Sequence, residues 1–191
     1  MLRLDRLKQT YAASVSTLRE ILNRLSAEGL VLAEAQRGFQ VMPVSAAELK
    51  DIAALRLLLE KHAMEQSFSA GDLEWEGAVL AAHYKLAHVE SQMLKRDSDQ
   101  PDTWKRYDWE FHRALVSACG SKALMEAYSA VYEKYLRYLM IALAFRDEIT
   151  AGEHKLLFDC AMKRDIATAQ DVLTQHINGC VEYAIQTNRI V

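Results

Sequence analysis

Residues that interrupt helices are scarce in this chain, which has only two prolines and seven glycines among its 191 residues. Proline and glycine are the residues that disfavour a helix interior most strongly, so most of the chain can be helical. Apolar residues make up 51% of the sequence and charged residues 26%, which is typical of a globular protein with a buried core. The sequence therefore predicts a mainly α fold and excludes an intrinsically disordered chain.

The first 44 residues combine helical and strand-like patterns. Residues 5–11 and 15–28 have the apolar spacing of helices, and Ser14 can cap the second of them. Two short apolar segments on either side of a polar turn then predict a β-hairpin near residues 30–42. Helix, short turn, helix and hairpin are the order of elements in the later part of a winged helix-turn-helix.

The remaining residues have only helical patterns. Ser45 and Glu48 form a capping box at the start of a long helix. Short connections between the helices that follow predict an antiparallel bundle of about six helices. We therefore expect two domains, a winged helix-turn-helix over residues 1–44 and an all-helical domain over residues 45–191. The later helices are expected over residues 72–96, 103–118, 121–144, 147–163 and 165–187.

The two expected domains differ in charge. Residues 1–44 contain six Lys or Arg against four Asp or Glu, whereas the remainder contains 17 against 22. A mildly basic domain attached to an acidic one suits a protein whose first domain meets the phosphates of DNA. The difference is too small to identify a DNA-binding domain by itself.

Other features of the sequence indicate a cytoplasmic protein. No apolar run approaches the roughly 20 residues that a membrane-spanning helix needs, so no membrane is expected as a partner. The cysteines are odd in number and show no CxxC spacing, and the N-terminus does not have the pattern of a signal peptide. The three cysteines are Cys119, Cys160 and Cys180.

Four side chains form a candidate metal site. Asp108 and His112 are four residues apart, so they share one face of a helix. His154 and His176 fall in two other expected helices, and a bundle could bring all four side chains to one interior point. Three histidines and a carboxylate suit Zn, Ni, Fe(II) or Mn(II). A histidine in a helix is more often an ordinary core or surface residue, and we assign that role to His62, His83 and His88.

Several segments resemble a known family of regulators. AASVSTLREILNRL (residues 12–25), EGLV (28–31) and RGFQV (37–41) are similar to the winged helix of GntR-type transcriptional regulators. ALRLLLE (54–60) resembles the first helix of the FCD effector domain found in the FadR-type branch of that family. The resemblance covers nearly the whole chain. Within the branch, residues 2–19 and the segment GDLEWE resemble carbon-starvation-induced regulators most.

The resemblance implies a homodimeric, DNA-binding transcriptional regulator, with repression expected. Small polar residues at the start of a recognition helix can meet DNA phosphates, and an arginine on that helix can reach a guanine edge. An arginine at the tip of the wing can contact the DNA backbone or minor groove. The expected DNA-binding residues are Ser14, Ser16, Thr17, Arg19 and Arg37.

The sequence departs from the family pattern in two places. Val15 occupies a position where the family often has an arginine that reads the major groove, so base recognition is expected to differ. Family members also have a helix and a strand ahead of the point where this sequence begins. The first domain therefore corresponds to a winged helix without about its first third.

The resemblance also implies that the second domain binds a metal ion and an effector. In the metal-binding FCD subgroup an Asp-x3-His motif is followed by a histidine after a glutamate and by another histidine 22 positions later, and all four positions match here. A divalent metal ion and a small organic-acid effector are therefore expected. Because a carboxylate in a closed bundle needs a cation, Arg56 is the first candidate to bind the effector and Arg146 the second.

Two other functions remain compatible with the residues. A metal-dependent enzyme of the helical-bundle type, acting on small organic acids, could also use His and Asp around a metal. The sequence contains no HExxH motif, nucleophile elbow or phosphate-binding loop to support an enzyme. A helical dimerisation module whose winged domain no longer binds DNA is the second alternative. The expected function is that of an effector-controlled transcriptional regulator rather than an enzyme.

Overall fold

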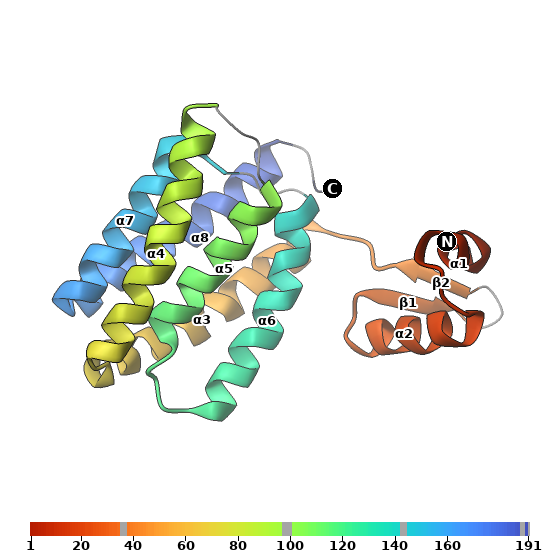
Figure 1. Ribbon diagram of the computed structural model, residues 1–191, viewed down its shortest axis with the longest axis horizontal. Helices are drawn as coiled ribbons and strands as arrows, with labels where there is room; N and C mark the ends of the chain where they lie inside the picture. Colours follow the sequence, from red (N-terminus) through yellow and green to blue (C-terminus); the bar gives the residue numbers. More distant parts are fainter. Residues whose placement is uncertain (35–37, 97–100, 142–144, 188–189, 191) are drawn as a thin grey trace. The chain divides into compact units, whose positions relative to one another are not determined.

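The computed structural model describes residues 1–34, 38–96, 101–141, 145–187 and 190. The chain forms two compact units, Met1–Val44 and Ser45–Val191, and each is described by itself (Figure 1). Arg37, the arginine expected at the wing tip, lies outside the described residues.

The first unit has the elements that the sequence predicts. Helices α1 (Leu4–Tyr11) and α2 (Val15–Ala27) are followed by the antiparallel strands β1 (Val31–Glu34) and β2 (Gly38–Val41). The turn after α2 contains Gly29, whose φ of +76° is a conformation that glycine adopts easily. The unit has a small apolar core made of Leu22, Val31 and Phe39.

In its described residues the second unit contains six long helices, and they lie side by side (Figure 1). Their positions confirm the predicted all-helical bundle, with one correction at a helix start. We expected Pro101 to belong to a break before a helix at residue 103, but the helix begins at Pro101 itself. Proline fits the first position of a helix because the missing N–H has no partner there in any case. The helices are α3 (Ala46–Ala70), α4 (Leu73–Leu94), α5 (Pro101–Val116), α6 (Lys122–Ile141), α7 (Asp147–Lys163) and α8 (Ile166–Gln186).

Side-chain caps define where three of these helices begin. Ser45 accepts a hydrogen bond from the amide of Glu48, Asp72 from that of Trp75, and Asp165 from that of Thr168. Such caps satisfy backbone donors that have no partner within the helix. Helix α4 packs against α5 and α7, α3 packs against α5, α6 and α8, and α7 packs against α8. Residues on α5, α7 and α8 can therefore meet inside the bundle.

Among the described residues, no helix is both long and apolar enough to cross a lipid bilayer.

The turn between α3 and α4 is held by a close aromatic contact. A Cβ added to Gly71 would lie 2.6 Å from the ring of Trp75 and 2.8 Å from the carbonyl oxygen of Ser67. Arg164, from the turn between α7 and α8, stacks over the same ring at 4.3 Å and donates a hydrogen bond to the carbonyl of Gly71. The absence of a side chain at position 71 thus allows two turns of the bundle to pack together.

Replacing Gly71 with alanine should destabilise the protein, because the added methyl group must displace the Trp75 ring or the backbone. Overpacking of this kind costs about 1–3 kcal/mol. Gly77 provides a matched control, since a Cβ there meets no atom within 4 Å. Because alanine is the better helix former, Gly77→Ala should stabilise the protein by about 0.5–1 kcal/mol. Urea unfolding measures the free energy of unfolding of both variants. Equal changes for Gly71→Ala and Gly77→Ala would contradict the packing around Gly71.

Candidate metal centre

The structure brings the four predicted ligands to one point inside the second unit. Asp108 and His112 lie one turn apart on α5, His154 lies on α7 and His176 on α8. One candidate ligand atom from each residue lies within 4.8 Å of those from the other three, and all four side chains are buried. The arrangement joins three helices that are far apart in sequence.

Each of the three histidines is oriented by a glutamate. The carboxylate contacts Nδ1 of the ring in every case, so Nδ1 donates to it and Nε2 is the nitrogen left for another partner. Carboxylate–histidine pairs of this kind are the usual support of a histidine that ligates a metal. The N–O distances are 2.6 Å for His112 with Glu60, 2.7 Å for His154 with Glu90 and 2.8 Å for His176 with Glu153.

Two of the inward-facing ring nitrogens are unsatisfied. The Nε2 atoms of His112 and His154 are buried and have no hydrogen-bond partner among the described residues. They lie 3.8 and 3.2 Å from Asp108 Oδ1, neither in hydrogen-bonding geometry. A buried polar atom without a partner costs about 1–3 kcal/mol, and a cation between these atoms would remove that cost. The donor set therefore fits a metal ion.

The second oxygen of Asp108 is held by α6. The hydroxyl of Tyr132 donates a hydrogen bond to Asp108 Oδ2 at 2.8 Å. Asp108 Oδ1 consequently faces the histidine rings while Oδ2 faces the tyrosine. This division leaves one carboxylate oxygen to act as a ligand and fixes the orientation of the group.

The surroundings change the pKa values of these side chains in different directions. Burial disfavours the charged form of Asp108, but the neighbouring histidines outweigh it and hold the pKa of the carboxyl well below its usual range. Burial also lowers the pKa of His154, yet the carboxylates of Glu90 and Asp108 raise it to about 9. For His176 burial prevails and lowers the pKa to about 4. Without a metal at pH 7, His154 is therefore protonated and His176 neutral.

Both arginines that we expected to bind an effector lie next to this cluster. Arg56 is buried on α3, and its Nε donates to Glu60 at 2.8 Å, the glutamate that supports His112. Its Nη2 atom is buried without a hydrogen-bond partner among the described residues. Arg146 donates to Glu153, the support of His176, at 2.6 Å. Each arginine is thus separated from a candidate ligand by one glutamate.

The glutamates that support the histidines were not among the residues predicted from the sequence. Glu60 is 0% exposed and Glu90 is 2% exposed, which is rare for glutamate unless it is paired. A signal was present, because both glutamates share a helix face with apolar core residues. Glu90 is further held by the indole N–H of Trp104 at 3.1 Å.

The other histidines have separate environments. His62 and His88 contact glutamine side chains one turn away on exposed faces of their helices. His83 stacks on Phe158 with 4.3 Å between ring centroids, where α4 packs against α7. These contacts match the ordinary roles that we assigned to them.

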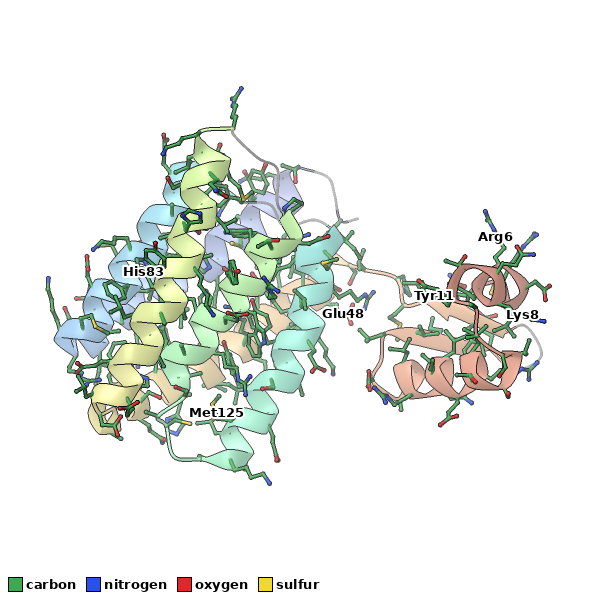
Figure 2. The ribbon with its side chains drawn as sticks, viewed as in Figure 1. Arg6, Lys8, Tyr11, Glu48, His83 and Met125 are labelled. Carbon is green, nitrogen blue, oxygen red and sulfur yellow. The ribbon has the colours of Figure 1, made fainter. Side chains whose placement is uncertain are left out.

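In the first unit, the expected DNA-contacting side chains lie at the start of α2. Ser14 caps the helix, and its hydroxyl is 2.7 Å from that of Ser16 and 2.9 Å from that of Thr17. Arg19 is exposed on the same helix. Basic side chains also extend from α1, where Figure 2 labels Arg6 and Lys8.

Comparison with known proteins places the chain in a family. Residues 51–179 match the model of the FCD domain. The chain is 33% identical over 187 residues to BphR of Paraburkholderia xenovorans, described as an uncharacterized HTH-type transcriptional regulator, covering 97% of this chain and 76% of that protein. It is 32% identical over 186 residues to GlaR, an HTH-type transcriptional repressor of Escherichia coli, covering 92% of this chain and 82% of GlaR.

A solved structure has the same fold. The crystal structure of a GntR regulator from Rhodococcus sp. RHA1 superposes with a TM-score of 0.75 at 20% identity, covering 97% of this chain and 86% of that one. The relatives named here are transcriptional regulators, which disfavours the metal-dependent enzyme that the residues alone left open. The chain belongs to the FCD-domain family of HTH-type transcriptional regulators.

Proposed function

We propose that the protein controls transcription by binding operator DNA through its first unit, under the control of a small organic acid that binds beside a divalent metal ion in the second unit. The observation that carries this proposal is the convergence of Asp108 Oδ1 with the unsatisfied Nε2 atoms of His112 and His154 in a buried site. The fourth ligand is His176.

The charges around the site favour a divalent ion. The supporting network contains four carboxylates, from Asp108, Glu60, Glu90 and Glu153, and two guanidinium groups, from Arg56 and Arg146. With neutral histidines this set has a charge of about −2, which a divalent cation balances. Nitrogen and oxygen ligands in this proportion suit Zn, Ni, Fe(II) or Mn(II).

The arginines suit an anionic effector. When bound, the metal would supply a Lewis-acidic centre to which a carboxylate of the effector can coordinate. The buried Nη2 of Arg56 has no hydrogen-bond partner among the described residues, and its guanidinium packs over the rings of Tyr132 and Tyr135, with Cζ 4.7 and 4.5 Å from their centroids. An arginine held in this way can bind a carboxylate with little loss of side-chain entropy. Arg146 is the second candidate.

DNA binding is assigned to α2 and the hairpin that follows it. Ser14, Ser16 and Thr17 bring hydroxyl groups to the N-terminal end of α2, where free amides also favour phosphate. Arg19 can reach the major groove from the same helix, and Arg37 is assigned to the wing. We further propose a homodimer, because two recognition helices about 34 Å apart read the two halves of a palindromic operator.

Replacing His176 with alanine should weaken metal binding and leave the fold intact, since Glu153 keeps Arg146 as a partner. A metal at 100 times its Kd stabilises a protein by about 2.7 kcal/mol, and the variant should lose most of this gain. His62→Ala is the control, because His62 is an exposed histidine outside the cluster. Metal analysis and thermal unfolding with and without zinc measure the effect. Full metal content in the His176 variant would show that the site is wrongly assigned.

Metal binding at pH 7 should release about one proton, because His154, whose pKa is about 9, must lose its proton to ligate through Nε2. Affinity should rise about tenfold per pH unit between pH 7 and 9 and then level off. The metal-free protein should instead lose stability as the pH rises from 6.5 to about 9, since a raised pKa stabilises only the protonated form. Calorimetry in buffers of different ionisation enthalpy counts the proton, and a pH-independent affinity would contradict the assignment.

Arg19→Ala should cost about 1–3 kcal/mol of binding to an operator selected from a random DNA library, provided that the guanidinium contacts a base. Arg24→Ala is the matched control on the same helix, because this exposed arginine pairs with Glu28 at 3.5 Å. Fluorescence anisotropy with the selected operator and with random DNA distinguishes the loss of a base contact from the loss of a phosphate contact. Equal losses on both DNAs for Arg19→Ala would show that Arg19 contacts only phosphate.

A further inference from the structure

One face of α6 carries four buried tyrosines. Not all of them take part in the proposed metal and effector site. Tyr128, Tyr132, Tyr135 and Tyr138 are each at most 1% exposed. Their spacing of four, three and three residues places them along the same side of the helix. Tyr138, near the end of this row, does not contact the metal ligands and has bonding partners of its own.

The second tyrosine of the row, Tyr132, lies at the candidate metal centre. Tyr132 donates to Oδ2 of Asp108, whose Oδ1 lies 3.2 Å from Nε2 of His154. A cation bound to Oδ1 would fix the carboxylate that holds the Tyr132 hydroxyl. The position of α6 therefore depends on how this carboxylate is oriented.

The row ends at the start of α3. The hydroxyl of Tyr138 donates to the carboxylate of Glu48 and accepts a hydrogen bond from the amide of Ser45 at 3.4 Å. Glu48 lies in the first turn of α3, where Figure 2 labels it, and Ser45 is the N-cap of that helix. Burial and the bond to Glu48 raise the pKa of Tyr138 to about 12, so the hydroxyl keeps its proton at neutral pH.

A displacement of α6 at Tyr132 can reach Tyr138, because the segment between them is short and well packed. Tyr132 and Tyr138 are six residues apart, which corresponds to about 9 Å along a helix. Between them, Arg56 of α3 packs over the ring of Tyr135 at 4.5 Å, so α6 and α3 are in contact through a buried cation. A shift of α6 at Tyr132 would therefore be felt at Tyr138 rather than absorbed by loose packing.

We propose that Tyr138 is a positioning residue that couples occupancy of the metal site to the first turn of α3, where the chain arrives from the DNA-binding unit. This inference rests on the proposed function. Coupling between two sites requires one structural element whose position both sites influence. Here that element is α6. Its Tyr132 bonds to Asp108, and its Tyr138 bonds to Ser45 and Glu48. Binding of metal then alters the start of α3 without any direct contact.

Hydrogen–deuterium exchange on the full chain, with zinc alone as the probe, tests this proposal. In the parent protein, zinc should slow amide exchange at residues 46–49 as well as on α5, α7 and α8. Tyr138→Phe keeps the buried ring but loses both hydrogen bonds, so exchange at residues 46–49 should become roughly tenfold faster. Zinc should still bind with unchanged affinity and protect α5, α7 and α8, but it should no longer change exchange at residues 46–49.

The control is Tyr84→Phe, which removes a hydroxyl from a tyrosine that is 72% exposed on α4 and should behave like the parent. If Tyr138 has only a structural role, exchange at residues 46–49 will be faster in its variant but will still slow on zinc addition, and the proposal is wrong. It is also wrong if zinc binds the parent without affecting these residues. Calorimetry that detects no zinc binding to the parent would instead overturn the metal site itself.

Discussion

The hydrogen bond that Nδ1 of each clustered histidine donates to a glutamate is the interaction on which the second unit depends. Each of these bonds joins two different helices: α3 to α5, α4 to α7, and α7 to α8. Together with the bond from Tyr132 to Asp108 and the bond from the indole of Trp104 to Glu90, they connect all six helices of the bundle. The same bonds occupy Nδ1 of each histidine and leave Nε2 for another partner, so the packing of the bundle and the geometry of the candidate site have one cause.

Burying a network of charged side chains in a protein core costs folding free energy. Burying carboxylates and guanidinium groups requires excellent geometry to offset their lost hydration, and apolar residues of similar volume would often stabilise a fold more. Here Arg56 and Glu60 are both buried, and the bond between them is 2.8 Å long. The Nε2 atoms of His112 and His154 still remain without hydrogen-bond partners among the described residues. This arrangement is better explained by ligand binding than by stability, because the unsatisfied atoms are those that a cation would use.

Sequence patterns were sufficient for most of the fold and for the four side chains that converge as candidate ligands, but not for the glutamates that support the histidines. The helices could be predicted because few residues interrupt their periodicity, and because Ser45 with Glu48 marked the start of α3. Asp108 and His112 were recognisable from their spacing on one helix face. Glu60 and Glu90 were not predicted, because a glutamate in a helix is usually solvated, although both lie on the apolar faces of α3 and α4 that the structure shows to be buried.

X-ray absorption spectroscopy of the zinc-loaded full chain tests the central claim most directly, because it reports which atoms surround the metal. The account predicts a shell of nitrogen and oxygen atoms at about 2.0–2.1 Å with the scattering pattern of three imidazoles. Substitution of His112, His154 or His176 should each remove one imidazole from that pattern. A sulfur ligand at about 2.3 Å, which would indicate a cysteine such as Cys180, or fewer than three imidazoles in the parent protein, would contradict the account.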